Sequence, residues 1–470
     1  MFKSLIADLP RAGDFPERQF RIHALTKVID GSLYDHLPHS FYTERNEAGE
    51  YIPVMKRRPS SRSNLCRVVV DDSVSLLFSE AHFPLISCKD ERTAQLLNLL
   101  VKETMLNQTM MDAATRGSVG SVAIFLRVLR SRVFFDVLST EYLTPEWRAD
   151  ALDRLAKVRE RFKLKGSALR ESGYQIVDED LGAEFWFGRD WDEVAETWYE
   201  PLKVSDAVGW PDKDQFSVDS SKTTLHKLGF VPIVWVKNLP NGDEIDGGCT
   251  FKAAIDTMIE IDYLMSQGSR GLRYSSDPTL LIKDSSGEGG EIVKGGGNAL
   301  KVDSTGDAKL LEISGSASQA MVAWIRMLRE SALEACHGNR SSADKVSAAA
   351  SGKAMEMMNQ ALIWLADKLR ISYGEGALLS LLNMVVRVSQ STDLVIKGVK
   401  VGALSTDDLS LRWGRWYHSS ASDRQADAQA LTTLTSAGIL SRESATKAVA
   451  DEYDIENVGA ERGLIEPRLL

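Results

Sequence analysis

Clustered glycines between residues 287 and 297 are the first candidates for chemistry, because a glycine loop that opens a helix can bind phosphate groups. The dinucleotide fingerprint needs a fixed glycine spacing and a helix directly after it. The run that begins Gly287-Glu288-Gly289-Gly290 has Ile292 at the last glycine position of that fingerprint. We therefore interpret these glycines as flexible connections between strands.

A second candidate phosphate loop ends at Gly352-Lys353. A P-loop needs a glycine five residues before this pair, where the chain has Ser347, and a hydroxyl residue after it, where the chain has Ala354. No hydroxyl is then available to ligate Mg²⁺. The pair is better explained as the start of a helix that follows a loop.

Clustered carboxylates could hold the paired metal ions of a nuclease, because such ions need several converging acidic ligands. The clusters are 71–72, 178–180, 190–193 and 243–246. Acidic clusters in a sequence are more often solvated faces or turns. The histidines show neither an HExxH motif nor a Ser/His/Asp arrangement; they are His23, His36, His39, His82, His226, His337 and His418. We predict no catalytic residue, no metal site and no cofactor.

The small polar loop 338–351 carries two cations, Arg340 and Lys345, among Ser, Ala and Gly residues such as Ser341 and Ser342. Taken alone, it is a solvated connection between two helices. Its length and low bulk would also suit a loop that reaches into a pore.

The composition is that of an ordinary globular protein of 470 residues, 43% hydrophobic and 26% charged, with a net charge of −10. Ten tryptophans argue against disorder. The acidic balance argues against a surface that grips nucleic acid throughout, since that affinity comes from Lys and Arg on phosphates. A small basic patch and passive enclosure of DNA both stay open.

The four cysteines, Cys66, Cys88, Cys249 and Cys336, form no CxxC pair, which predicts free thiols in a reducing compartment. The first ten residues lack the apolar core of a signal peptide. No stretch approaches the roughly 20 apolar residues of a membrane span. We expect no membrane contact and a chain that is cytoplasmic when it is synthesised.

The elements that would position these residues can be read from hydrophobic periodicity. In the first half, helices are predicted at 65–78 and 93–109, and strands at 121–128, 131–138, 174–177, 184–187 and 230–238. The charged segment 152–164 fits a helix or a long strand.

A central run reads helix 251–270, about 30 Å long, then strands at 279–282, 291–294, 299–302 and 309–313, then helices 317–336 and 352–369. The remainder predicts a helix at 376–388, a strand at 394–396, a helix at 422–434 and a short helix capped by Ser441. The fold class is therefore α+β and mainly helical.

Three stretches of the chain resemble the portal proteins of tailed bacteriophages, in the branch found in long-tailed phages. The first is 67–75, together with the preceding Pro59 and Asn64, which resembles the start of the family's N-terminal helix. The second is 230–271, with the spacing Asp256, Ile261, Asp262, Leu264 and Ser266. The third is 413–449, where SAGILSRESA is the most specific match. Element order agrees over most of the chain.

The resemblance implies a portal fold with named parts. These are a wing at 1–245 that returns at 373–423, a first stem helix at 246–272, a clip at 273–316, a second stem helix at 317–338, a tunnel loop at 339–351, a tunnel helix at 352–372 and a crown at 424–470. It implies closed rings of twelve subunits around a central channel. Twelve copies of a −10 chain would carry −120, which suits DNA that must slide.

The resemblance further implies a non-enzymatic channel for packaging and ejecting DNA at one capsid vertex of the virion, assembled in the host cytoplasm. Implied partners are double-stranded DNA, the terminase large subunit, a head–tail adaptor, and the major capsid and scaffolding proteins. The clip, with Gly287, Gly290, Lys294 and Gly296, would dock the motor or tail connector.

In the tunnel loop, Arg340, Ser341, Ser342 and Lys345 would face DNA. The two cations could touch passing phosphates or form salt bridges between subunits, and both readings stay open. The alternative function is a metal-dependent phage nuclease that uses the acidic clusters. A host enzyme of unknown chemistry is disfavoured by the missing motifs.

Overall fold

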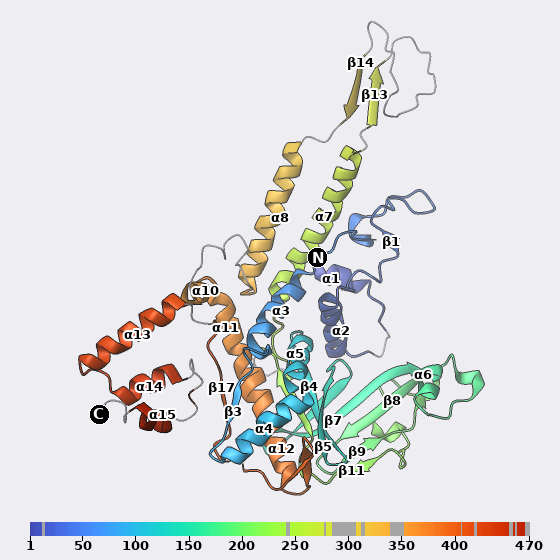
Figure 1. Ribbon diagram of the computed structural model, residues 1–470. Coiled ribbons are helices and arrows are strands. Elements are labelled where there is room, and N and C mark those ends of the chain that lie inside the picture. The colour runs from blue at the N-terminus through green and yellow to red at the C-terminus, as the bar shows by residue number, and fades with distance from the viewer. Residues whose placement is uncertain are drawn as a thin grey trace. The chain divides into compact units, whose positions relative to one another are not determined.

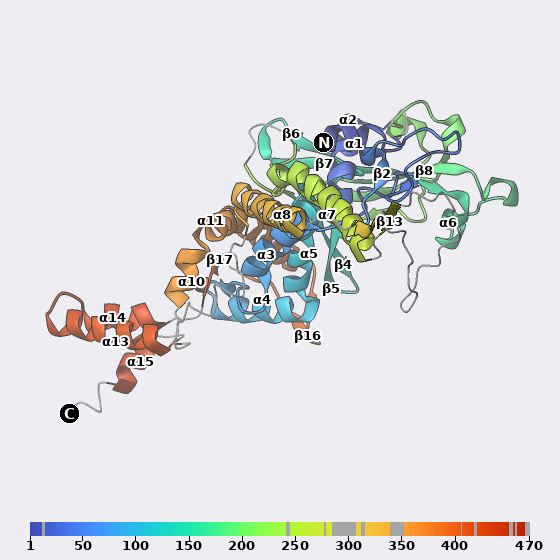
Figure 2. The same ribbon diagram turned by 90° about the horizontal axis from the view of Figure 1, so that it is seen from above.

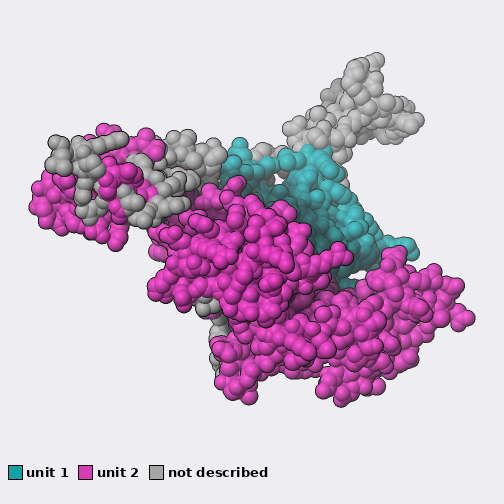
Figure 3. Space-filling view, turned by 60° about the horizontal axis from the view of Figure 1, so that its bottom comes forward, with its two compact units in different colours: residues 1–11, 27–67, 252–336 teal, residues 12–26, 68–251, 337–470 magenta. Residues whose placement is uncertain are grey.

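The computed structural model describes residues 1–11, 15–240, 245–276, 279–283, 307–311, 315–338, 352–405, 407–417, 421–450, 455 and 458–465. In these residues the fold is α+β and mainly helical, which confirms the prediction (Figure 1). The chain divides into two compact units, coloured separately in Figure 3. Unit 1 comprises residues 1–11, 27–67 and 252–336, and unit 2 comprises 12–26, 68–251 and 337–470.

Unit 1 is organised around two long helices, α7 (Ile255–Ser276) and α8 (Gly315–Ala335), which lie side by side in Figures 1 and 2. Strands β13 (Thr279–Lys283) and β14 (Asp307–Leu311) pair antiparallel, with Thr279 opposite Leu311. Its other elements are α1 (Phe2–Ala7), β1 (His39–Ser40), η1 (Val54–Lys56), β2 (Arg57–Arg58) and η5 (Lys252–Ala254).

In this unit the two predicted helices of the central run and the first and last of the four strands predicted between them are confirmed. The first helix begins at Ile255, after the 3-10 turn η5, and ends at Ser276 rather than near 270. The expected strands 291–294 and 299–302 lie outside the described residues. Helices α2 (Glu17–Ile29) and α3 (Leu65–Phe78) have residues in both units, and α3 has the predicted bounds.

Unit 2 contains two larger antiparallel sheets. One has the order β11-β9-β8-β7-β6, with β10 beside β8, and the other has the order β12-β4-β5. The strands of the first are β6 (Leu143–Arg148), β7 (Ala151–Lys165), β8 (Glu184–Trp191), β9 (Ala195–Trp198), β10 (Leu202–Lys203) and β11 (Thr224–Leu225); those of the second are β4 (Ser121–Leu129), β5 (Arg132–Leu138) and β12 (Ile233–Lys237).

The smaller elements of unit 2 complete its sheets and turns. Two further strand pairs are β15 (Leu394–Ile396) with β16 (Val399–Val401), and β17 (Ser410–Arg412) with β3 (Leu85–Ser87). Short helices are α6 (Gly166–Glu171), η2 (Asp178–Asp180), η3 (Val204–Asp206) and η4 (Lys213–Gln215). Strand β15 is where the sequence predicts it.

The core of the sheets is aromatic and branched. Its buried residues are Ala123, Phe125, Leu143, Val158, Trp191, Val231 and Ile233. Strand β4 supplies the middle of it because its run of apolar residues is buried on both faces. The β4–β5 turn uses Arg130 and Ser131 with φ of 49° and 65°, the left-handed pair that suits a tight hairpin.

The charged segment 152–164 is a strand, which resolves the two readings of the sequence. Its charges are matched across the sheet: Arg161 Nη1 lies 2.8 Å from Asp190 Oδ1, and Arg189 Nη2 lies 2.8 Å from Glu160 Oε2. A helix would have placed these partners apart. Cross-strand charge pairing therefore explains why so polar a run is extended.

Two predictions of secondary structure are wrong. Residues 174–177 form no strand; Tyr174 and Ile176 instead pack their side chains against the buried Leu169, Phe185 and Phe187. The expected helix 93–109 is two helices, α4 (Glu91–Thr104) and α5 (Leu106–Gly117), because Met105 between them is left-handed at φ 50°. Apolar periodicity continues through this break and hides it.

A long helical series follows in unit 2. It consists of α10 (Gly352–Met358), α11 (Gln360–Leu369), the π-helix η6 (Arg370–Leu378) and α12 (Leu379–Ser389). The sequence predicts separate helices at 352–369 and 376–388, with glycines between them. The structure joins them through wide π turns, which accommodate Gly374 and Gly376 without ending the helix.

The chain closes with α13 (Ala421–Ser436), α14 (Arg442–Ala450) and α15 (Val458–Ile465). Gly438, at φ 70°, follows the end of the first helix. The Oγ of Ser441 accepts a hydrogen bond of 3.1 Å from the Ser444 N–H, so this residue caps α14 as predicted.

Candidate functional site

The helix pair of unit 1 is the main candidate site because it carries the β13–β14 ribbon. At one level the helices come very close, since a Cβ at Gly268 on α7 would lie 2.7 Å from Met321 Sδ on α8. At the opposite end, Ile255, Met258 and Ile259 of α7 and Ala332 and Leu333 of α8 are buried. Burial of this apolar seam stabilises the pair as one stiff element.

Cys336 directly follows α8 and contacts the residues that precede α7. Its side chain is buried, and the backbone N–H groups of Ala253 and Ala254 hydrogen-bond to it. Burial raises the pKa of the thiol. All four cysteines of the chain have free thiols. A buried thiol of raised pKa is a packing group and a poor nucleophile.

A polar clasp joins the segment 31–67 to α7. The Tyr34 hydroxyl donates to Asp262 Oδ2 at 2.8 Å, and the Ser63 N–H donates to Asp262 Oδ1 at 2.6 Å. The Ser61 N–H donates to Ser266 Oγ at 3.1 Å. Asp262 and Ser266 belong to the residue spacing that carries the portal resemblance. The structure gives that spacing a physical reason, because both side chains are buried and bonded to this segment.

Burial is the dominant influence on the charges of the clasp. It raises the pKa of Asp262 against the opposing effect of the Ser63 and Tyr34 hydrogen bonds. It also raises the pKa of Tyr34, with the Asp262 charge as the next cause. Tyr263, the next residue, donates its hydroxyl to Arg57 O at 2.9 Å. Arg57 is itself buried and donates to Ile52 O.

A second buried network lies in unit 2, where strand β12 ends. Asn238 Nδ2 donates to Gly248 O at 2.8 Å and to Thr250 Oγ1 at 2.8 Å. The hydroxyl of Tyr373, in the π-helix η6, donates to Asn238 Oδ1 at 3.0 Å. Asn238 and Tyr373 are both fully or almost fully buried. We call these residues the Asn238 hub.

Close packing leaves the hub no spare space. A Cβ at Gly117, the last residue of α5, would lie 2.1 Å from the Tyr373 hydroxyl. A Cβ at Gly247 would lie 2.5 Å from Leu239 O. The hub therefore fixes η6, β12 and the segment 247–250 together. Sequence reasoning missed it; the available signal was an Asn at the end of an apolar strand.

Three carboxylates of the acidic clusters, Asp180, Asp190 and Asp246, each form an ion pair with a Lys or Arg. Asp246 Oδ1 is bound by Arg18 at 2.8 Å and by the Ser121 hydroxyl at 2.6 Å. Asp190 binds Lys157 at 2.6 Å and Asp180 binds Lys203 at 2.6 Å. Among the described residues, no three His, Cys, Asp or Glu side chains could hold a metal ion together.

One Ser–His pair resembles part of a catalytic arrangement. Ser79 Oγ lies 2.8 Å from His82 Nδ1, and His82 Nε2 lies 2.9 Å from the Trp416 carbonyl. A carbonyl accepts only, so Nε2 carries the proton, and Nδ1 accepts from the Ser79 hydroxyl. A triad would place a carboxylate where this carbonyl lies. The pair anchors the 410–417 segment.

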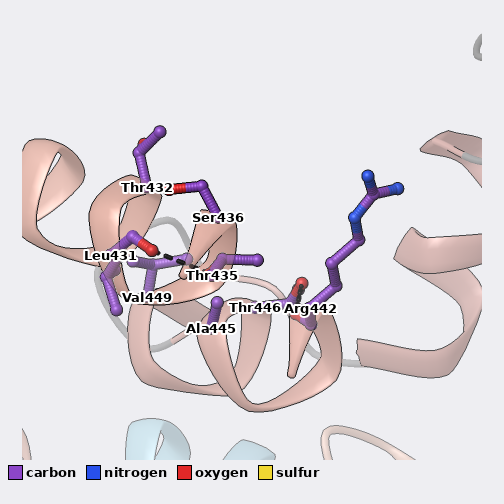
Figure 4. Close-up of a pocket in the computed structure, with 8 residues that line it drawn as sticks. All are labelled: Leu431, Thr432, Thr435, Ser436, Arg442, Ala445, Thr446 and Val449. Atoms are coloured by element: carbon purple, nitrogen blue, oxygen red, sulfur yellow. Dashed lines mark hydrogen bonds between the residues drawn. The ribbon is translucent and has the colours of Figure 1, made fainter. Parts of the chain in front are cut away.

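A groove between α13 and α14 is the other hollow of note (Figure 4). It has a volume of about 490 Å³ and is lined by Leu431, Thr432, Thr435, Ser436, Arg442, Ala445, Thr446 and Val449. Its lining offers hydroxyls and one guanidinium but no general base. It is a space between packed helices.

The site residues named from the sequence fall outside the described parts of the chain. They are the tunnel-loop residues Arg340, Ser341, Ser342 and Lys345 and the clip residues Gly287, Gly290, Lys294 and Gly296. The flanking elements are described: α8 ends before the first group, and α10 begins after it. None of the described helices is long and apolar enough to cross a membrane.

The fold is of the α+β class, and its unit 1 is organised around a helix pair with a two-stranded β-ribbon between the helices in sequence. A family model described as phage portal protein, SPP1 Gp6-like, matches residues 169–463, more than half of the chain. The chain therefore belongs to this portal family, which confirms the resemblance seen in the sequence. Two of the three stretches that carry it, 230–271 and 413–449, lie inside the match.

Solved structures similar to the chain come from gene transfer agent (GTA) particles. They are the virion of the native particle (11% identity, TM-score 0.41), the neck of the native particle computed with C12 symmetry (11%, 0.42) and the neck of the empty particle computed with C6 symmetry (12%, 0.40). Each match covers 82% of this chain and 88% of the other. No curated protein matches the sequence.

Proposed function

We propose that this portal protein forms a closed ring of twelve subunits at one capsid vertex, with a central channel through which double-stranded DNA is packaged and ejected. The observation that carries the proposal is the α7–α8 pair with its β-ribbon, in a chain whose residues 169–463 match the portal family. A ring follows when a head-to-tail interface closes on itself. The subunit acts as a structural part and catalyses no reaction.

The parts of the subunit take separate roles. We assign α7 up to residue 272 and α8 from residue 317 to the stem. Residues 273–316, which include β13 and β14, form the clip, where the terminase large subunit and the head–tail adaptor dock in turn. Residues 339–351 are the tunnel loop and 352–372 the tunnel helix. The wing and crown regions would face the major capsid and scaffolding proteins. Assembly takes place in the host cytoplasm and ends in the virion.

The tunnel loop would contact DNA without sequence preference. Arg340 and Lys345 can touch passing phosphates, and phosphate contacts carry no sequence information. The net charge of −10 per chain keeps the rest of the ring repulsive to DNA, so that the strand slides. The competing role for these two cations, ion pairs between subunits, predicts that their loss weakens the ring instead.

The nuclease alternative finds no support in the acidic clusters, since Asp180, Asp190 and Asp246 each bind a Lys or Arg of the same chain. Mass photometry of the purified full-length chain tests the proposal. Twelve chains of 51.9 kDa give a particle of about 620 kDa. The same sample should leave linear DNA intact with Mg²⁺. A monomer that cuts DNA would refute the proposal.

A further inference from the structure

The tunnel helix has two apolar faces, and only one of them is used within the subunit. Its buried face consists of Leu362, Ile363, Leu365, Ala366 and Leu369. On the opposite side, Met357, Trp364 and Ile371 are 76%, 56% and 67% exposed. A row of large apolar side chains on the exposed side of a helix marks a surface that another protein surface can cover.

The spacing of the exposed residues makes them a continuous stripe. They are seven residues apart, which is close to two helical turns, so their side chains lie nearly above one another. The backbone carries the helix through the α10–α11 junction, because Asn359 N–H bonds to Met355 O and Ile363 N–H bonds to Asn359 O, each at 3.0 Å. We call Met357, Trp364 and Ile371 the outer stripe.

Two exposed charges of opposite sign flank this stripe. Asp367 and Lys368 lie three and four residues after Trp364, which places them on opposite sides of it at nearly the same height. Neighbouring residues in a helix do not face each other, so the two cannot pair with one another. Within the described part of the chain neither forms an ion pair; Asp367 only acts at a distance on Arg370.

We propose that the outer stripe is a ring-closing interface and that its occupant is the same helix of a second copy of this chain. The proposal rests on the ring proposed above. In a ring of parallel helices related by rotation, the Lys368 edge of one subunit meets the Asp367 edge of the next at the same height. Each subunit then satisfies both charges, with Trp364 in the seam between them.

This arrangement explains the residue types at the seam. Trp and Met are enriched at protein interfaces, and large aromatic side chains are the usual energetic hot spots. Asp367 and Lys368 set the orientation of neighbouring subunits. In a head-to-tail contact the Lys368 edge of one helix faces the Asp367 edge of the next, whereas a neighbour shifted along the helix axis would not align these charges. The stripe lies in the helix that directly follows the tunnel loop, so the interface would hold the loops of adjacent subunits in register.

The proposal can be tested by exchanging the charges at positions 367 and 368. Mass photometry of the full-length protein over a concentration series measures the concentration for half-assembly. Asp367→Lys or Lys368→Asp alone places like charges at every seam. Each should raise the concentration for half-assembly at least about tenfold. The double exchange D367K/K368D restores unlike edges and should return assembly to within about threefold of the wild type. Co-purified single variants should assemble together into rings of even copy number.

Side-chain removal tests the apolar part. Trp364→Ser should also raise the half-assembly concentration at least about tenfold, as expected for a hot spot. The matched control is Val208→Ser, an 81% exposed site on another part of unit 2, which should leave assembly unchanged. Circular dichroism and thermal unfolding of each variant separate lost assembly from lost folding.

The outcomes separate this inference from the proposed function. If Asp367→Lys and Lys368→Asp each form rings as well as the wild type does, the inference is wrong and the proposed ring is unaffected. A well-folded double exchange that fails to recover also overturns it. A wild-type chain that forms no ring at any concentration overturns the proposed function itself, before any variant is compared.

Discussion

At the scale of single residues, the Asn238 hub shows how little freedom the buried parts of unit 2 have. Its central hydroxyl, on Tyr373, donates to Asn238 Oδ1 and would lie only 2.1 Å from a Cβ at Gly117. A buried polar group that loses its partner costs its full desolvation energy. The hub therefore constrains which residues positions 117, 238 and 373 can hold.

We expect Gly117→Ala to lower the free energy of unfolding by about 1–3 kcal/mol, because its methyl group meets the Tyr373 hydroxyl. Tyr373→Phe alone should cost about 1–3 kcal/mol by leaving Asn238 Oδ1 without that donor. Urea denaturation of both variants and of the double variant measures the coupling. The two costs should be less than additive, since Phe removes the atom that clashes.

The control for the glycine is Gly182→Ala, where an added Cβ has no heavy atom within 4 Å. That change should alter stability by less than about 0.5 kcal/mol. Strictly additive costs at 117 and 373 would show that the contact does not exist in solution.

A second residue-scale prediction concerns Asp262. Burial raises the pKa of this carboxyl above its usual 3.8, so the folded chain holds the proton more tightly than the unfolded chain. Its contribution to stability is then fully present below about pH 3.8 and is lost as pH rises through the folded pKa. The wild type should lose stability relative to Asp262→Asn as the pH rises above about 3.8, because the pKa of this carboxyl is raised in the folded chain.

The measurement is the difference in unfolding free energy between the two proteins at each pH. The rest of the chain titrates alike in both, and the difference isolates position 262. Tyr34, Ser63, Arg62 and Tyr263 interact with this carboxyl. A difference that stays constant over this range, or that rises in favour of the wild type, would contradict the assignment.

At the scale of elements, the π-helix η6 sets the course of the long helical series. Arg370, at its start, stacks between Trp413 and Trp416, at 4.6 and 3.2 Å from their ring centres. Burial lowers the pKa of this guanidinium to about 10. Gly374, one turn later, receives the edge of the Trp413 ring. Arg370 and Gly374 of the π-helix η6 thus pack against the tryptophans of the segment 410–417.

Two glycines of η6 provide a matched pair of variants. In Gly374→Ala, the methyl group would lie 2.4 Å from Trp413 Cζ2, part of a rigid ring, so we expect a loss of about 1–3 kcal/mol. In Gly376→Ala, the nearest atom is Ile371 O at 3.4 Å, which is ordinary contact. That variant should be neutral or up to about 1 kcal/mol more stable, because Ala favours helix.

Chemical denaturation, followed by tryptophan fluorescence, measures both variants. Trp413 is itself a reporter, and its emission should shift in the first variant. Equal stabilities for the two variants would mean that η6 does not pack on Trp413 as described.

The sequence predicted an element correctly where a single local signal, such as apolar periodicity or a capping residue, determines it. Helix α3 and the central helix–strand–strand–helix order follow from apolar periodicity, and the cap at Ser441 follows from residue chemistry. Periodicity could not reveal the left-handed Met105 or the π turns of η6, because both leave the apolar pattern intact. It also could not place β7, whose charges are satisfied only by partners such as Asp190 and Arg189 on another strand.

At the scale of the whole molecule, we propose that the chain is one subunit of a ring. The portal family match covers 169–463 and so includes both long helices of unit 1 and the tunnel helix. The candidate site could be predicted only as parts: the helix pair was visible in the sequence, whereas its clasp to the segment 31–67 joins residues some 200 positions apart. Such contacts have no local signal.

The outer stripe belongs to the same scale. In an isolated subunit, Met357, Trp364 and Ile371 leave apolar surface in contact with water. That contact is unfavourable, because burial of apolar surface is the main term that stabilises a folded chain. In the proposed ring, a neighbouring subunit would supply that burial. The −10 charge of each chain would then add up around the proposed ring and oppose DNA adhesion.

Electron microscopy of the purified full-length protein, viewed along the particle axis, tests the central claim most directly. The account predicts closed rings of one chain type, with rotational symmetry and an open central channel. Twelve subunits are expected in particles taken from capsids. Monomers, two-fold dimers or filaments without a central channel, at concentrations where the chain is folded, would contradict it.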